Sequence, residues 1–110
     1  MSSLIAGERE LGSGAIEPLS FQFDDYTSIE VVSVEAYKNG SGSDVSAFIM
    51  PSGSHGAAGN ILTTKPVQSL TQNAYYILRM IVTVNGTTQR DERYFRLVCP
   101  NAKSGLVRTN

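Results

Sequence analysis

The chain has 110 residues, of which 41% are hydrophobic and 17% are charged. This is the composition of a folded globular protein, and the length suits one domain but not two separate cores. Nine basic and ten acidic residues give a formal net charge of -1, which leaves no concentrated positive field for the phosphates of nucleic acid. Nucleic-acid binding is therefore disfavoured.

Neither a membrane segment nor a disulfide framework is expected. No apolar stretch approaches the roughly 20 residues that a membrane-spanning helix needs, and the opening residues lack the basic start and apolar run of a signal peptide. Cys99 is the single cysteine, so no intrachain disulfide can form. These features predict a soluble protein that folds in a reducing compartment and has no membrane partner.

Both ends of the chain differ in composition from its middle. Residues 1–14 are small, polar and glycine-bearing, and residues 101–110 contain little that could be buried. We therefore predict a flexible N-terminal segment over residues 1–14, a folded domain over residues 15–100 and a flexible C-terminal tail over residues 101–110.

The first strands are predicted from apolar residues that alternate with polar ones. Leu19, Phe21 and Phe23 would share one face of a strand. The next β-branched run contains the adjacent pair Val31 and Val32, which breaks the alternation. That pair predicts a β-bulge or burial on both faces.

The middle of the chain is predicted to be made of short elements and loops. Residues 39–44 have the composition of a turn, and residues 45–50 read as a short apolar strand. Residues 52–60 contain three glycines and are predicted to form a surface loop. Residues 61–64 and 67–70 are predicted to be short strands separated by a proline.

The strongest local signal is a C-terminal hairpin. Two long β-rich runs flank Asn85 and Gly86, the preferred pair for a two-residue turn in which both positions have positive φ. A two-residue turn predicts the opposed pairs Tyr76–Phe95, Ala74–Leu97, Ile77–Tyr94 and Arg79–Glu92. These aromatic, aliphatic and opposite-charge pairs are mutually supportive cross-strand contacts in one register.

These elements together define the expected fold class. No helical period runs through the chain, and turn signals recur about every 8–12 residues. About seven short strands with this spacing predict an all-β fold, an immunoglobulin-like antiparallel β-sandwich. In such sandwiches a tyrosine near the start of the penultimate strand closes a corner by bonding to upstream backbone. Tyr75 or Tyr76 is the candidate here, and a plain core aromatic is the alternative.

His55 and Cys99 are the residues with the most reactive side chains. His55 follows Ser54 and precedes Gly56, but no nucleophile-elbow motif surrounds it, so an exposed loop histidine is the favoured interpretation. A catalytic thiol needs a lowered pKa from a neighbouring base or helix, and no helix is expected near Cys99, which favours a core position. One cysteine and one histidine cannot supply a closed set of zinc ligands.

Two acidic pairs, Asp24 with Asp25 and Asp91 with Glu92, were the remaining candidates for chemistry. Paired carboxylates can hydrolyse glycosides across a cleft or hold Ca²⁺ on a loop. Neither pair has the alternation of a dedicated calcium loop, and the first has the composition of a turn. The glycines of residues 52–60 match no phosphate-binding motif. We therefore predict no catalytic residue, no cofactor and no metal site.

The C-terminal hairpin also resembles a known group of proteins. Residues 75–86, and residues 90–97 with their Asp-Glu-Arg entry into the last strand, are similar to small Ig-like structural proteins of tailed phages and prophages. The aromatic strand that ends in acidic residues at 21–25 is similar too. Residues 38–70 match the group poorly, and extra residues separate the turn from Asp91.

The resemblance implies a non-enzymatic structural or assembly protein of the virion, made in the host cytoplasm and then carried in the particle. Its expected partners are other head or tail proteins, and homo-oligomerisation is left open. A carbohydrate-binding or adhesion module that contacts a cell-surface glycan is the alternative, with either residues 52–60 or the exposed Tyr26 and Tyr37 as the stacking platform. A hydrolase is a third, weaker hypothesis, because no constellation specifies a reaction.

Overall fold

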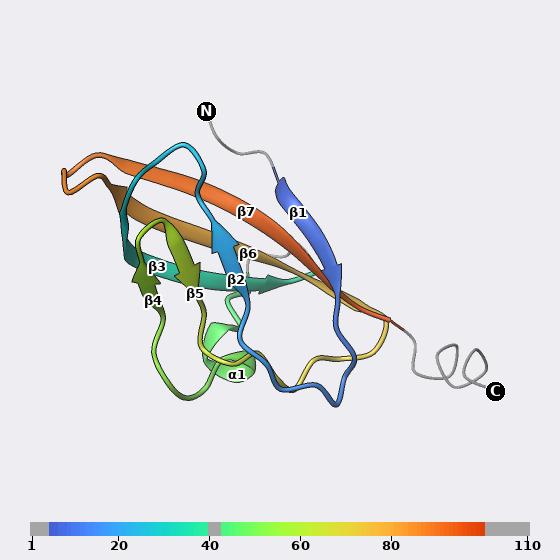
Figure 1. The fold of residues 1–110 in the computed structure, drawn as a ribbon. Helices are drawn as coiled ribbons and strands as arrows, with labels where there is room; N and C mark the ends of the chain where they lie inside the picture. Colours follow the sequence, from blue (N-terminus) through green and yellow to red (C-terminus); the bar gives the residue numbers. More distant parts are fainter. Residues whose placement is uncertain (1–4, 40–42, 101–110) are drawn as a thin grey trace.

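Two β-sheets pack face to face in the computed structural model, which describes residues 5–39 and 43–100. The larger sheet has the order β1-β7-β6-β3 and the smaller the order β2-β5-β4 (Figure 1). An all-β sandwich, as predicted, is confirmed. The elements are β1 (Ile5–Glu10), β2 (Ser20–Gln22), β3 (Ile29–Lys38), α1 (Ser46–Ile49), β4 (Gly56–Ala58), β5 (Ile61–Thr63), β6 (Ala74–Val84) and β7 (Arg90–Cys99).

The core lies between the two sheets. Along β6 every second side chain is buried for all 11 residues, which is the period of a strand with one face on a core. The predicted alternation of Leu19 and Phe23 also holds, since both side chains are at most 2% exposed. The largest fully buried side chains come from both sheets and their connections: Tyr76, Phe23, Ile49, Met50, Leu62, Leu78, Met80, Leu97, Val67, Val82 and Cys99.

Tyr76 forms the predicted tyrosine corner. Its ring is 1% exposed, and its hydroxyl accepts a hydrogen bond of 2.9 Å from the backbone N–H of Thr71, five residues upstream. The bond satisfies a backbone donor that the turn before β6 would otherwise leave unpaired. Tyr75, the other candidate, is half-buried on the opposite face of the strand.

A β-bulge interrupts β3 where the sequence predicted one. The pairing of β3 with β6 shifts between Val31 and Ser33, so Val32 has no opposite residue and its side chain is 41% exposed. The extra residue returns Val34 and Ala36 to the core face.

The predicted register of the β6–β7 hairpin is wrong by two residues. Ala74 faces Cys99, Tyr76 faces Leu97, and Arg79 faces Tyr94. A slip of two residues leaves every side chain on its predicted face of the sheet, because strand side chains alternate with a period of two.

The cause of the slip lies just after the predicted turn residues. Asn85 and Gly86 have positive φ angles of 51° and 71°, and the carbonyl of Val84 accepts the N–H of Thr87 at 3.0 Å. The hydroxyl of Thr87 then donates to Val84 O at 2.6 Å and accepts from the N–H of Gln89 at 3.1 Å. Pairing resumes only at Gln89, so two more residues enter the loop.

The expectation of a flexible segment over residues 1–14 does not hold for its described part. Ile5–Glu10 form β1, which runs parallel to the edge of β7. Leu11 continues the pairing, since its N–H donates to Val98 O at 2.9 Å and its side chain is buried. The open backbone of β7 supplies the pairing that this polar sequence does not predict by itself. The predicted tail, residues 101–110, lies outside the described residues.

Three predictions for the middle of the chain also need correction. Residues 45–50 were expected to be a strand, but Ser46–Ile49 form the short helix α1. The carboxylate of Asp44 accepts both the N–H and the hydroxyl of Ser46, which turns the chain into a helical start. Residues 52–60, expected to be a loop, contain β4. Residues 67–70 form no strand, although Val67 pairs with Glu17 in an isolated bridge.

Candidate functional site

The solvent-facing side of the larger sheet gathers residue types that dominate protein interfaces. The half-buried side chains of β6 point away from the smaller sheet, and register neighbours on the other strands extend this surface. Tyrosine and arginine are strongly enriched at binding hot spots. We call this surface the outer face; its residues are Glu8, Glu35, Tyr37, Tyr75, Ile77, Arg79, Ile81, Glu92, Tyr94, Arg96 and Val98.

A chain of polar contacts crosses the outer face through Arg79. Its guanidinium pairs with Glu92 on β7 and with Glu35 on β3, the latter at 3.2 Å. The hydroxyl of Tyr94 donates to Glu92 at 2.8 Å, and the hydroxyl of Tyr37 donates to Glu35 at 2.7 Å. Three strands are therefore tied together on their exposed side, with a tyrosine at each end of the chain.

These contacts fix the charges of the network near neutral pH. The hydrogen bond from Arg79 holds the pKa of Glu92 below its usual range. Hydrogen bonding to Glu92 and Glu35 raises the pKa of Tyr94 and Tyr37 respectively. Glu92 is therefore ionised, and both tyrosines are neutral and donate from their hydroxyls.

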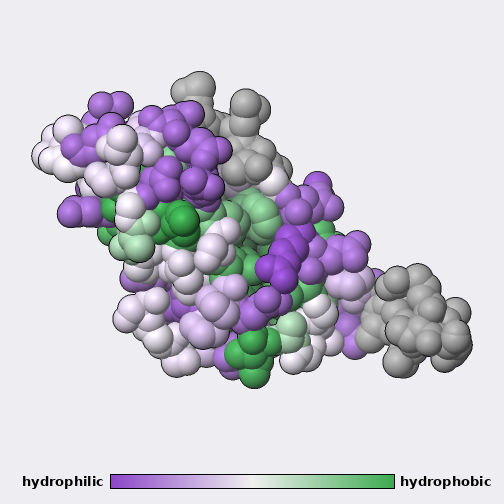
Figure 2. Space-filling model, in the orientation of Figure 1, coloured by the Kyte–Doolittle hydropathy of each residue, from purple (hydrophilic) through white to green (hydrophobic). Residues whose placement is uncertain are grey.

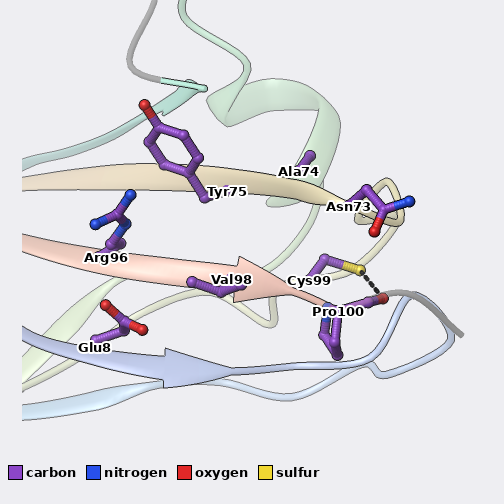
Figure 3. A pocket seen from close by; sticks show the side chains of 8 residues that line it. All are labelled: Glu8, Asn73, Ala74, Tyr75, Arg96, Val98, Cys99 and Pro100. Carbon is purple, nitrogen blue, oxygen red and sulfur yellow. Dashed lines mark hydrogen bonds between the residues drawn. The ribbon is translucent and has the colours of Figure 1, made fainter. Parts of the chain in front are cut away.

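Arg96 lies beside Tyr75 at one end of the outer face (Figure 3). The central carbon of its guanidinium is 4.5 Å from the centroid of the tyrosine ring, a cation–π distance. Both residues line a hollow of about 440 Å³, together with Glu8, Asn73 and Pro100. The Nε atom of Arg96 is buried and has no hydrogen-bond partner among the described residues.

The two acidic pairs are only partly brought together. Asp25 and Asp91 both bind the guanidinium of Arg93, at 2.9 and 3.0 Å. Asp24 is exposed to solvent, and Glu92 lies on the opposite face of β7 from Asp91. An arginine thus holds the position between carboxylates that a metal ion would need, and the described residues contain no group of three or more His, Cys, Asp or Glu that could hold one.

Arg93 also packs on aromatic rings beside the two carboxylates. Its guanidinium is 4.8 Å from the ring centroid of Phe23 and 5.8 Å from that of Tyr26. The hydroxyl of Tyr26 donates to Asp91 at 2.9 Å, a contact that raises the pKa of the tyrosine. The cluster joins the connection between β2 and β3 to β7.

His55 is not the exposed loop residue that the sequence predicted. Its side chain is half-buried, and its Nδ1 accepts the backbone N–H of Lys65 at 3.0 Å. Burial first, and the charge of Lys65 second, lower the pKa of His55. Cys99, in contrast, is a fully buried core residue as predicted, and burial raises the pKa of its thiol.

The tyrosines named as a sugar-stacking platform are less accessible than expected. Tyr26 and Tyr37 are both half-buried, and their hydroxyls are bound to Asp91 and Glu35. Tyr26 also lies against the guanidinium of Arg93. The sequence-based expectation of two exposed rings is therefore wrong.

An apolar groove opens beside β2, at the free edge of the smaller sheet. Phe21, Phe23, Met80, Phe95 and Arg93 line a hollow of about 220 Å³ there. The rings of Phe21 and Phe95 meet edge to face with centroids 4.7 Å apart. Figure 2 shows hydrophobic residues reaching the surface in the middle of this side of the molecule.

No family model, curated protein or solved structure matches this chain. Residues 5–39 and 43–100 contain no helix long and apolar enough to span a lipid bilayer.

The outer face was not predicted as a surface. Its signal was present in the alternation of Glu92, Tyr94 and Arg96 along β7, with Arg79 opposite Tyr94 and Ile77 opposite Arg96 on β6. Such alternation identifies residues on a common face. It does not distinguish side chains that pair internally from those left for a partner.

Proposed function

We propose that this protein is a non-enzymatic interaction module with an immunoglobulin-like fold, and that its outer face binds another structural protein of a phage or prophage virion. The outer face carries the proposal: it combines three tyrosines, two arginines and three aliphatic residues on one stiff sheet. Large rigid side chains on a preorganised surface lose little conformational entropy on binding.

The order of the strands supports the immunoglobulin-like part of this proposal. Counted along the chain, strands two, five and four form one sheet, and strands three, six and seven lie side by side in the other. Those are the positions of strands B, E, D and C, F, G in immunoglobulin domains. The Tyr76 corner at the start of the sixth strand is a further feature of such domains. The first strand lies beside the seventh.

The virion part of the proposal rests on the resemblance of residues 75–86 and 90–97 to phage Ig-like proteins. The polar contacts of the outer face agree with a binding role, because Arg79 is held in place by Glu35 and Glu92 within the sheet. The described contacts around Asp25, Asp91 and Arg93 are structural and suggest no reaction.

Mass spectrometry of gradient-purified particles from the phage or induced prophage that encodes the chain tests the proposal. We expect the protein in particles at a reproducible copy number. Its absence from particles would overturn the virion assignment.

A matched pair of variants tests the role of the outer face. Ile81→Gln places a polar group in the middle of that face, and Ala58→Gln makes a similar change on exposed β4 of the other sheet. We expect Ile81→Gln to lower incorporation into particles about tenfold or more, with Ala58→Gln incorporated as the parent protein. Circular dichroism melting confirms that both variants fold. Equal incorporation of the two would exclude the outer face.

A further inference from the structure

Among the described residues, three arginines are half-buried, and two of them are paired with carboxylates. Arg79 lies between Glu35 and Glu92, and Arg93 lies between Asp25 and Asp91. Arg96 is comparably placed on β7, but it forms no ion pair with any carboxylate of the described residues. A partly desolvated guanidinium without an anion is an energetic cost, because burial of charge is normally offset by pairing.

The surroundings of Arg96 hold its side chain in place without neutralising it. The guanidinium stacks on the ring of Tyr75 at 4.5 Å, and its Nε is shielded from water. Figure 3 shows the guanidinium directed toward the tyrosine, with the carboxylate of Glu8 on the other side. A stacked arginine is already oriented, so less entropy is lost when its remaining N–H groups bind an anion.

The hollow beside Arg96 has room for a side chain from another molecule. Its volume of about 440 Å³ lies within the range of ligand-sized cavities. Val98 and Pro100 contribute apolar surface to the hollow, and Asn73 lies at the opposite end from Arg96 (Figure 3). A planar cation beside an apolar surface suits a carboxylate on an aliphatic stem.

We infer that Arg96 and Tyr75 form a receptor for a carboxylate of the binding partner, either an aspartate or glutamate side chain or a free C-terminus. This inference rests on the proposed function, since it names the chemistry by which one end of the outer face recognises its partner. The anion binds the exposed N–H groups of the Arg96 guanidinium. It gives Arg96 the ion pair that Arg79 and Arg93 already have within the chain.

Glu8 lowers the affinity of this site for carboxylates. It is the register partner of Arg96 on β1, and its exposed carboxylate lines the same hollow without an ion pair to the arginine. A nearby negative charge opposes the entry of a second one. Glu8→Gln therefore increases the affinity of the site for carboxylates, by about two- to fivefold as for other exposed charge pairs.

Titration followed by ¹H–¹⁵N NMR tests the inference on the whole chain, because the Arg96 Nε–H signal reports directly on the guanidinium. The probes are a short acetylated and amidated polyglutamate peptide, an acetylated glycine-serine peptide with a free C-terminal carboxylate, and the same glycine-serine peptide amidated. The first two distinguish a side-chain carboxylate from a C-terminal one. The third peptide has no carboxylate and controls for binding through the peptide backbone alone.

We expect at least one carboxylate probe to shift the Arg96 and Tyr75 signals saturably, while the amidated glycine-serine peptide does not. Arg96→Gln lowers the affinity of that probe about tenfold or more. Arg90→Gln is the matched control, because it removes the same charge from an exposed position on the same strand and leaves the affinity nearly unchanged. Glu8→Gln increases the affinity.

Equal losses of probe affinity for Arg96→Gln and Arg90→Gln would show that the probe responds only to the net charge of the protein, and would overturn the inference. The absence of any shift of the Arg96 signal would overturn it as well. A chain that enters particles normally but ignores both carboxylate probes would refute this inference alone. A chain that binds the probes through Arg96 but is absent from particles would refute the virion assignment alone.

Discussion

Asn85 joins two turns that lie far apart in the sequence. Its φ angle is 51°, and its side-chain oxygen accepts the N–H of Thr27 at 2.9 Å and the Thr27 hydroxyl at 3.0 Å. Its own N–H donates to Ser28 O at 2.8 Å. One residue therefore provides both the positive φ of the hairpin and the clamp that holds the β2–β3 connection against it.

Substitution of Asn85 separates these two roles. Asn85→Gly keeps the backbone conformation and removes the acceptor, so we expect a loss of about 1–3 kcal/mol in the free energy of unfolding. Asn85→Ala adds about 1 kcal/mol of backbone strain. Urea denaturation measures both. Asn73→Gly, at another positive φ of 66° on an exposed residue, is the control. A similar loss at Asn73 would mean that the side-chain clamp is unimportant.

His55 gives the fold a mild sensitivity to acid. Its pKa is lowered from the ordinary 6.5, so the unfolded chain binds a proton more readily than the folded one. The stability contributed by neutral His55 is thus present above about pH 6.5 and falls as the pH drops through the ordinary pKa. We expect the urea midpoint to decrease between pH 7.5 and 5.5, and His55→Gln, which retains an acceptor, to reduce that decrease. An identical pH dependence in both proteins would contradict this account.

At the scale of elements, the loop of the β6–β7 hairpin sets where pairing begins, but not which side chains face the core. Val84 N–H donates to Gln89 O at 3.1 Å, so the first closing pair lies beyond Thr87 and Thr88. The buried side chains of the two strands, such as Tyr76 and its partner Leu97, decide which face of each strand packs on the core.

Deletion of Thr87 and Thr88 tests which feature controls the register. The shortened chain brings Gln89 directly after Gly86, so the pairing of Val84 with Gln89 closes a two-residue turn. We expect the cross-strand nuclear Overhauser contacts of Tyr76 with Leu97 to persist and stability to change by less than about 1 kcal/mol. Deletion of Thr88 alone should destabilise the protein more, because an odd change opposes the alternation of the faces. A new register after the double deletion would show that the turn controls pairing.

The contrast between β6 and α1 explains how far the sequence could predict the elements. β6 has an uninterrupted period of two, and it was recognised together with its neighbour β7. The apolar residues Phe48 and Ile49 suggested a strand, but the two bonds from Ser46 to Asp44 start a helix there. A single local hydrogen-bonding side chain overrides weak propensity in a segment this short.

Non-local pairing limits the prediction in other places. The β1 sequence carries Gly7, Glu8, Arg9 and Glu10, which suggest a polar tail, and only the edge of β7 makes it a strand. The candidate site shows the same limit. Alternation places Arg79 and Arg96 on one face, but which arginine receives a carboxylate depends on the register of three strands.

At the scale of the whole molecule, side-chain hydrogen bonds hold the connections at the ends of the two sheets in place. Tyr76 secures the corner before β6, and Asn60 donates from its amide to Phe23 O and Tyr26 O at 3.2 and 3.1 Å. The core cluster extends between these joints and includes Cys99 at the end of β7. The accessibility of the Cys99 thiol therefore reports whether the core is intact.

The thiol of Cys99 should react only when the sandwich opens. It is 0% exposed, and burial raises its pKa, so both access and ionisation are suppressed in the folded protein. We expect labelling by a thiol reagent to follow global unfolding across a urea series. The double variant Cys99→Ser with Ser52→Cys places a thiol at an exposed position and should label at once. Rapid labelling of native Cys99 would instead reveal local opening at the end of β7.

The position of β1 has a consequence for colloidal behaviour. An uncovered β7 would present a long row of free backbone donors and acceptors, which is a template for adding strands from other molecules. β1 occupies that edge and brings Glu8, Arg9 and Glu10, three exposed charged residues, to the new border of the sheet. Charged side chains on a short border strand discourage sheet-to-sheet polymerisation. β1 thus protects this edge of the sheet against aggregation.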